Sequence, residues 1–318
     1  MLQLFKKLKV INLSHSKHLN KIPNPSCVPN LEILTLEGCR FTFDSPHETL
    51  ELLTNFFSLI LIGCINLESL PRSIYKLRRL KTLCCGGCKN LRSFPEIMGN
   101  MEKLRKLDLD NTAIVKLPSS IEHLKGLEYL DLSNCKDLIT VPQSICNLTS
   151  LKFLNLDFCS KLEKLPEDLK SLKCLQKLYL QDLNCQLPSV SGLCSLKVLN
   201  LSESNVIDKG ILINICHLSS LEELYLNNCN LMDGEIPSEV CQLSSLKELD
   251  LSWNHFSSIP ASISQLSKLK ALGLSHCRNL LQIPELPSTL QFLDAHNSHF
   301  TLSSPSSFLP SSFSEFQV

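Results

Sequence analysis

The stretch that decides the fold is LEYLDLSNCKDLITVPQSICNLTSLKFLNLDFCSKLEKLP, residues 127–166, which contains one pattern twice. The pattern is L-x-x-L-x-L-x-x-C-x-x-L-x-x-L-P, with valine replacing the last leucine in the first copy. The two copies are Leu127, Leu130, Leu132, Cys135, Leu138, Val141, Pro142 and Leu151, Leu154, Leu156, Cys159, Leu162, Leu165, Pro166. They lie 24 residues apart, and a fixed period of this length indicates a repeat protein.

The pattern extends along almost the whole chain. Its first leucine, or a phenylalanine in its place, falls at Leu8, Leu31, Phe56, Leu80, Leu104, Leu127, Leu151, Leu175, Leu196, Leu221, Leu246, Leu269 and Leu290. These 13 units recur every ~23.5 residues on average, the spacing of leucine-rich repeats. Each repeat of a solenoid contacts only its neighbours, so the chain can exceed the usual size of one core. We expect residues 1–300 to form a single leucine-rich-repeat domain, followed by a tail or linker to a further domain at residues 301–318.

Each unit is expected to hold one short strand. Successive strand residues point to opposite faces, so Leu130 points into the core while Tyr129 and Asp131 point out. Parallel strands are predicted at positions such as 129–131, 153–155 and 248–250. The return segments are short and contain proline, which favours 3₁₀ or extended turns over long helices. The predicted class is α/β, a leucine-rich-repeat solenoid shaped as an open horseshoe, with strands on its concave face and mostly 3₁₀ turns on its convex face.

Three parts of the chain depart from the pattern. Residues 41–55 contain Ser45-Pro46-His47-Glu48, a capping-box sequence that predicts a short helix over about Pro46–Thr54. Residues 183–193 and 206–218 lose the pattern after their strands, so the least regular loops are expected there.

Cysteine usage indicates a reducing compartment. One position of the repeat is occupied by Cys39, Cys64, Cys88, Cys135, Cys159, Cys229 and Cys277, with Thr112 and Asn254 in two other units. This position faces inward, where cysteine acts as a small apolar residue with a weak S–H donor. We expect these thiols to be reduced, as in the cytosol.

The first residues of the chain, MLQLFKK, contain no apolar segment of the kind found in signal peptides. No apolar run approaches the ~20 residues of a membrane span. We therefore expect a cytoplasmic protein that also enters the nucleus. Leu2, Leu4 and Phe5 have no polar cap before them, which favours a chain cut from a longer protein over an irregular folded-back cap.

Little in the sequence indicates catalysis. It contains no phosphate-binding loop and no dinucleotide-binding glycine motif. Cys85-x-x-Cys88 has the spacing of half a zinc site, but no second pair follows, so core packing is the better interpretation. His15 with His18, and His296 with His299, are interpreted as isolated surface pairs. We expect no enzyme activity, no cofactor and no metal.

The outward strand positions favour recognition of another protein. Aromatic side chains exposed among carboxylates are typical of interface anchors. The candidate partner-binding residues on the concave face are Tyr129, Asp131, Phe153, Asp157, Phe158, Tyr179, Tyr225, Asp250 and Trp253. The carboxylates favour a basic partner. The alternative is that a wide sheet tolerates these side chains, with lysines lying over the rings.

Several segments of the repeat text resemble a known family. They are LKVINLS (8–14), PNLEILTLEGC (29–39), LDNTAI (109–114) and ELPSTLQFLDAHN (285–297). They resemble the leucine-rich-repeat region of plant intracellular immune receptors, more narrowly the class with an N-terminal Toll/interleukin-receptor domain and a nucleotide-binding switch. The resemblance covers about residues 1–300. It implies that the repeats recognise pathogen effectors, or a guarded host protein, and hold the switch inactive.

Two other classes share this type of repeat. An intracellular leucine-rich-repeat scaffold would have the same fold. A cell-surface receptor ectodomain would need a signal peptide and paired capping cysteines, neither of which is seen in this sequence, although units ten and eleven have its repeat style.

A formal net charge of zero hides an asymmetry along the chain. Residues 1–107 carry +8 and residues 108–318 carry −8. The candidate basic patch consists of Arg72, Arg78, Arg79, Lys81, Arg105 and Lys106. No aromatic stacking platform accompanies it, which argues against nucleic acid, and no membrane partner is expected. The resemblance implies an intramolecular contact with an upstream nucleotide-binding domain; a solvated face is the alternative.

Overall fold

The computed structural model describes residues 4–19, 21–22, 24–43, 52–99 and 101–300. The chain divides into two compact units, Met1–Pro188 and Ser189–Val318. Within each unit, short parallel strands follow one another in the sheet in the order in which they occur in the chain. The predicted class, an α/β leucine-rich-repeat fold, is confirmed.

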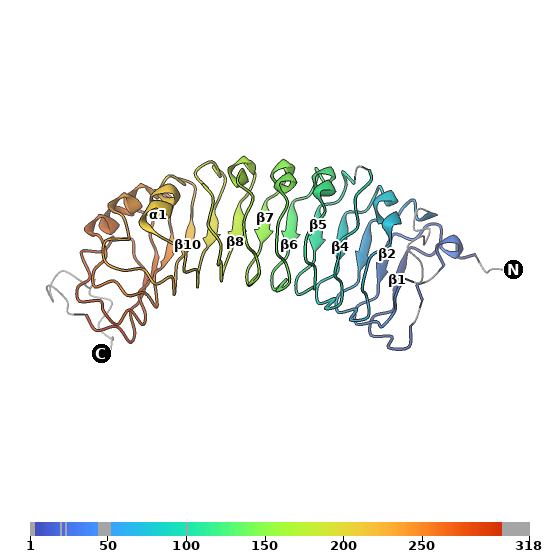
Figure 1. The fold of residues 1–318 in the computed structure, drawn as a ribbon, viewed down its shortest axis with the longest axis horizontal. Coiled ribbons are helices and arrows are strands. Elements are labelled where there is room, and N and C mark those ends of the chain that lie inside the picture. The colour runs from blue at the N-terminus through green and yellow to red at the C-terminus, as the bar shows by residue number, and fades with distance from the viewer. Residues whose placement is uncertain (1–3, 20, 23, 44–51, 100, 301–318) are drawn as a thin grey trace. The chain divides into compact units, whose positions relative to one another are not determined.

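The described part of the first unit contains eight strands of three residues each. They are β1 (Val10–Asn12), β2 (Ile33–Thr35), β3 (Ser58–Ile60), β4 (Thr82–Cys84), β5 (Lys106–Asp108), β6 (Tyr129–Asp131), β7 (Phe153–Asn155) and β8 (Lys177–Tyr179). Figure 1 shows β4 to β8 side by side in chain order. Neighbouring strands align the same repeat position, as in the series Leu130, Leu154 and Leu178. This register is favoured because a slip by one residue would expose every core leucine.

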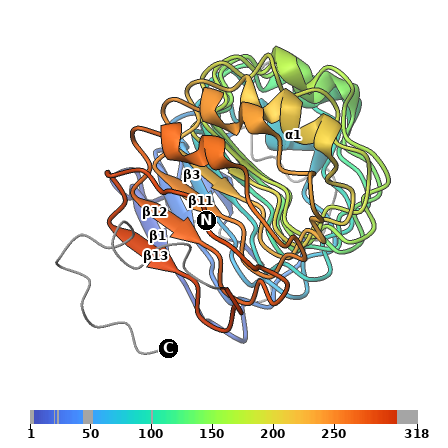
Figure 2. The ribbon, with the colours of Figure 1, turned by 90° about the vertical axis from the view of Figure 1, so that its left-hand side faces the viewer.

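The described part of the second unit contains five strands and one α-helix. The strands are β9 (Val198–Asn200), β10 (Glu223–Tyr225), β11 (Glu248–Asp250), β12 (Ala271–Gly273) and β13 (Phe292–Asp294). The helix is α1 (Lys209–Cys216). In Figure 2, β11, β12 and β13 lie on one side of this unit and α1 lies apart from them. The strands predicted at 129–131, 153–155 and 248–250 are all confirmed.

Short 3₁₀ turns occupy the return segments, as predicted. They are η1 (Pro25–Cys27), η3 (Arg72–Lys76), η4 (Ser119–His123), η5 (Gln143–Asn147), η6 (Leu169–Ser171), η7 (Ser238–Gln242) and η8 (Ala261–Gln265). Five of them begin directly after a proline, at Pro71, Pro118, Pro142, Pro237 and Pro260. Proline suits this place because the first N–H of such a turn has no partner inside it.

The predictions for the irregular segments were only partly right. Residues 183–193 form neither helix nor strand, as expected. The expectation of a loop over 206–218 is wrong, because α1 forms there. The Asp208 carboxylate caps α1 by accepting a 2.8 Å hydrogen bond from the Ile211 N–H, and Leu212, Ile215 and Cys216 are buried at helical spacing. Most of the helix predicted at Pro46–Thr54, and the tail at 301–318, lie outside the described residues.

The inward cysteine position forms a ladder of S–H hydrogen bonds. The thiol of Cys135 donates to the Leu109 carbonyl of the preceding unit at 3.1 Å, and that of Cys159 donates to the Leu132 carbonyl at 3.2 Å. None of the 16 cysteines, all of which lie in the described residues, forms a disulfide bond. Cys85 and Cys88 are fully buried, which confirms their interpretation as core residues.

Candidate functional site

Three of the predicted aromatic residues form a continuous row on the strand face of the first unit. The rings of Tyr129 and Phe153 stack in parallel with centroids 4.2 Å apart, and Phe153 lies 5.5 Å from Tyr179. All three side chains are half-buried. They come from the adjacent strands β6, β7 and β8, so the parallel register brings together rings that are about one repeat apart in the sequence.

Charged groups border one end of this row. The ammonium of Lys106 lies 4.7 Å from the centre of the Tyr129 ring and 3.3 Å from the Asp108 carboxylate. The Tyr129 hydroxyl donates a 2.8 Å hydrogen bond to the Asp131 carboxylate. The Lys106 ammonium over the ring and the Asp131 carboxylate at the hydroxyl together fix the orientation of the Tyr129 ring. The row is therefore preorganised.

Two carboxyl groups beside the row have a pKa that is raised by burial. Burial raises the pKa of Asp157 to about 6, although its carboxylate accepts a 2.6 Å hydrogen bond from the Gln181 N–H. Burial, followed by the neighbouring Asp108, raises the pKa of Asp110 to about 6. Desolvation disfavours the charged form of a carboxyl group, and this raises the pKa of both.

Phe158 and Trp253 occupy an unusual backbone position. In each unit, the third residue after the strand has a positive φ, and most units place glycine, asparagine or aspartate there. Phe158 has a φ of 58° and Trp253 a φ of 61°. A bulky residue in this left-handed region costs roughly 1 kcal/mol or more. The sequence analysis included both among the candidate partner-binding residues, but nothing in the sequence indicated this left-handed backbone.

The second unit contains a shallow hollow of about 240 Å³ over β11, β12 and β13. We call it the β11–β13 hollow; its lining includes Glu248, Asp250, Trp253, Gly273, Phe292 and Asp294. The predicted residues Asp250 and Trp253 both line it, whereas Glu248, Phe292 and Asp294 were not among the predicted site residues. Tyr225 lies on the adjacent strand β10, and its hydroxyl donates a 3.1 Å hydrogen bond to Glu223.

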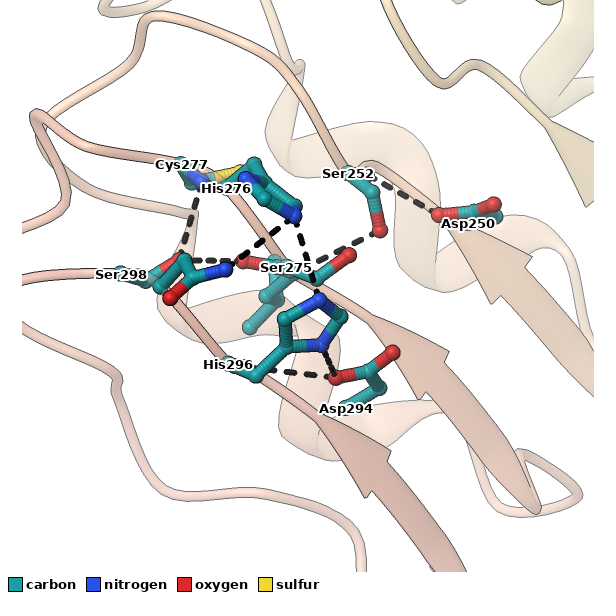
Figure 3. Close-up of polar contacts among 10 residues, drawn as sticks. Asp250, Ser252, Ser275, His276, Cys277, Asp294, His296 and Ser298 are labelled. Atoms are coloured by element: carbon teal, nitrogen blue, oxygen red, sulfur yellow. Dashed lines mark hydrogen bonds and ion pairs between the residues drawn. The ribbon is translucent and has the colours of Figure 1, made fainter. Parts of the chain in front are cut away.

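A chain of two histidines and one aspartate borders this hollow (Figure 3). The His296 imidazole lies between the Asp294 carboxylate, 2.5 Å from its Nδ1, and the His276 ring, with 3.1 Å between the two Nε2 atoms. The His276 ring in turn stacks on Trp253 with centroids 3.8 Å apart. The interpretation of His296 as part of an isolated pair with His299 is therefore wrong. Its partner is His276 on the neighbouring repeat. His276 belongs to no motif that the sequence would have revealed.

The residues of the predicted basic patch fall into two groups in the first unit. Arg72, Arg78, Arg79 and Lys81 are exposed. Arg105 is instead committed to its own repeat, because its guanidinium donates to the Glu102 and Gly126 carbonyls at 2.6 and 2.9 Å. Lys106 belongs to the aromatic row described above.

The described residues contain no cluster of three or more His, Cys, Asp or Glu arranged to hold a metal ion. None of the helices in the described part of the chain has the length and apolar character needed to cross a membrane.

The fold and its repeated strand face define a leucine-rich-repeat protein. A family model described as the leucine-rich repeats of RPS4B-like disease resistance proteins matches residues 76–305. The chain therefore belongs to the leucine-rich repeats of this family of plant disease resistance proteins, and the resemblance stated from the sequence is confirmed.

Individual relatives agree with this assignment. The chain is 36% identical to the disease resistance-like protein DSC1 of Arabidopsis thaliana over 94% of its own length, and 37% identical to the TMV resistance protein N of Nicotiana glutinosa over 91%. It spans only 24% and 26% of those two proteins. Among solved structures, it is similar to a leucine-rich-repeat protein of Leptospira interrogans with a TM-score of 0.67, at 27% identity over 93% of this chain and 86% of that chain.

Proposed function

We propose that this chain is the protein-recognition part of a plant immune receptor, and that the strand face of β5 to β8 binds a pathogen effector or a guarded host protein. The observation that supports this most is the stacked row of Tyr129, Phe153 and Tyr179. Family membership places the chain in a disease resistance protein, and the row supplies a surface suited to a protein partner.

The row has the physical properties of an interface anchor. Stacked aromatic rings on adjacent strands lose little conformational entropy on binding because their neighbours already hold them. The hydroxyl groups of Tyr129 and Tyr179 add polar atoms at the edge of an apolar surface. Asp131 and Asp157 flank the rings, so the preferred partner presents basic residues around an apolar centre.

The test is made in a full-length receptor that contains this chain. Phe153→Ala combined with Tyr179→Ala should abolish effector-triggered cell death without lowering the protein level. Tyr75→Ala is the matched control, because Tyr75 is a half-buried aromatic residue on the 3₁₀ turn η3 instead of on a strand. An unchanged response in the double variant would remove this surface from the proposal.

We further propose that the exposed part of the basic patch contacts the nucleotide-binding domain of the same receptor and helps to hold it inactive. Charged contacts of this kind fix orientation and weaken with salt. Arg78→Glu with Arg79→Glu should cause autoactivity or loss of association with the separately expressed domain. Arg105 is left intact, because its hydrogen bonds stabilise its own repeat. An unchanged resting state, association and response would make the patch a solvated surface.

The proposed role is binding, without catalysis or a cofactor, in the cytoplasm or nucleus. The lack of a disulfide among the 16 cysteines, all of them described, supports a reducing location. A fluorescent fusion of the full-length receptor tests the location directly, and a signal confined to the secretory pathway would contradict it.

A further inference from the structure

The β11–β13 hollow arises from the register of three strands. Asp250 on β11 pairs with Gly273 on β12, which pairs with Asp294 on β13. Two positions earlier along each strand, on the same face, Glu248 pairs with Ala271, which pairs with Phe292. The middle strand thus presents two very small residues between larger neighbours. Strands lie about 4.8 Å apart, so the side chains of β11 and β13 face each other across about 9.6 Å.

There is little room for a side chain at Gly273. A Cβ atom built on Gly273 would overlap Oδ1 of Asp250 and would lie 3.0 Å from the Ser252 hydroxyl oxygen. A larger residue would therefore displace the Asp250 carboxylate or fill the hollow. Glycine at this position keeps both carboxylates, Asp250 and Asp294, open to the same space.

The chemistry of the lining selects a cation with a flat apolar surface. The described residues that line the hollow include three carboxylates, on Glu248, Asp250 and Asp294, and no lysine or arginine. Lys247, which precedes β11, is already paired with Glu222 at 2.5 Å. Two aromatic side chains complete the walls, with Trp253 49% exposed and Phe292 60% exposed.

Trp253 is held in place before any partner arrives. Its ring stacks on His276, and the chain of His296 and Asp294 fixes His276 in turn. Figure 3 shows the contacts of His276, His296 and Asp294 near the side chains of Asp250 and Ser252. Trp253 has a left-handed backbone, with a φ of 61°, which is unfavourable for a bulky residue, and about half of the residue is nevertheless exposed. An exposed, strained and supported aromatic ring is suited to contact a ligand.

A polar side chain also opens on this space. Ser275 is only 6% exposed and lines the hollow. Its backbone N–H donates to the Ser252 hydroxyl at 3.2 Å. A hydroxyl oxygen has two lone pairs, so the Ser275 hydroxyl can accept a hydrogen bond from a donor that enters the hollow.

From these features we propose that the β11–β13 hollow binds one arginine side chain of a partner protein. The guanidinium lies between the carboxylates of Asp250 and Asp294, donates to the Ser275 hydroxyl and stacks on Trp253. Arginine fits better than lysine because its planar fork pairs with carboxylates and stacks on aromatic rings. The proposal rests on the recognition function proposed above, for which it supplies the chemistry of one contact in the second unit.

The experiment uses the single tryptophan of the chain as its reporter. The indole N–H signal of Trp253 is followed by NMR in the 318-residue protein as a nine-residue Gly/Ser peptide with one central arginine is added. Single-residue contacts support affinities on the order of millimolar. We expect a saturable shift in that range, a weaker response to the lysine peptide, and none to the citrulline peptide, which has the shape of arginine without its charge.

Two variants and one matched control locate the binding. Asp250→Asn with Asp294→Asn should weaken binding of the arginine peptide at least about tenfold, as expected for loss of charged hydrogen bonds. Gly273→Ala should weaken it by filling the hollow while leaving every charge in place. Glu239→Gln with Glu285→Gln also removes two negative charges from the second unit, but at residues that do not line the hollow. This control should leave binding unchanged.

Three results would overturn the proposal. They are an absent indole shift with the arginine peptide, an equal shift with the citrulline or lysine peptide, and equal weakening by the control variant. The peptide comparison needs only the unaltered protein, so it decides even if a variant fails to fold. The two proposals can fail separately. If the arginine peptide does not bind but the double variant of Phe153 and Tyr179 still abolishes cell death, this contact is refuted and the proposed function stands.

Discussion

Asn254 should be one of the most important polar residues for stability, and its replacement gives a sharp test of the repeat geometry. It occupies the inward position that seven other units fill with cysteine, and it is fully buried. Its side-chain oxygen accepts hydrogen bonds from the Cys229 and Leu231 N–H groups at 3.1 and 3.0 Å. Its amide nitrogen donates to the Leu226 and Leu251 carbonyls at 2.9 and 2.8 Å.

The effect of Asn254→Ala follows from counting the groups left without a partner. The Leu251 carbonyl keeps its hydrogen bond from the Cys277 thiol, so three backbone groups lose their hydrogen bond to Asn254 with no other to replace it: the Cys229 and Leu231 N–H groups and the Leu226 carbonyl. Each buried unsatisfied group costs about 1–3 kcal/mol, and water entering the vacated space recovers part of this. We expect the free energy of unfolding to fall by about 3–6 kcal/mol, a large share of the ~5–15 kcal/mol of a typical domain.

Two further variants make the test specific. Asn254→Cys restores a donor for the Leu226 carbonyl but no acceptor for the two N–H groups, so its loss should be intermediate. Cys135→Ala changes the same repeat position, but the Leu109 carbonyl keeps the Thr112 hydroxyl, so about 1 kcal/mol or less is expected.

Urea unfolding followed by circular dichroism and by Trp253 fluorescence measures these differences. Hydrogen exchange at the amides of Cys229 and Leu231 reports the local effect. A loss below about 1 kcal/mol for Asn254→Ala, or full recovery in Asn254→Cys, would refute the reasoning.

Three other predictions concern the core, the acidic groups and the thiols. Leu154→Asp places an unpaired carboxylate at a site only 1% exposed, so it should cost more than about 4 kcal/mol, and an unchanged melting temperature would contradict the register. Burial raises the pKa of Asp157 from its usual 3.8 to about 6, so its contribution to stability is complete below about pH 4 and is lost as the pH rises through 6. Asp157→Asn should flatten the stability curve between pH 4 and 7, and an identical curve would argue against this burial. Thiol reagents should modify the exposed Cys174 and Cys194 first in the native protein, whereas burial raises the pKa of Cys135 and should protect it until unfolding; labelling of Cys135 at the rate of Cys174 would contradict its burial.

The sequence by itself determined the repeat, the strands and the inward position of the cysteines. This was possible because each unit repeats the same local requirement, a period-two strand whose leucines must be buried, and the requirement recurs every ~23.5 residues. The helix α1 was missed because loss of the leucine pattern over 206–218 was interpreted as irregularity. Asp208 with apolar residues at 212, 215 and 216 was the signal that would have predicted it.

Only the tertiary structure decided which side chains meet across neighbouring repeats. The sequence identified Tyr129, Phe153 and Tyr179 as outward residues, but their stacking depends on ring orientations that a pattern does not contain. The β11–β13 hollow depends on Gly273 lying between Asp250 and Asp294, and the support of Trp253 depends on His276 meeting His296. These residues are one to two repeats apart in the chain, and the pairing of parallel strands alone brings them within contact distance.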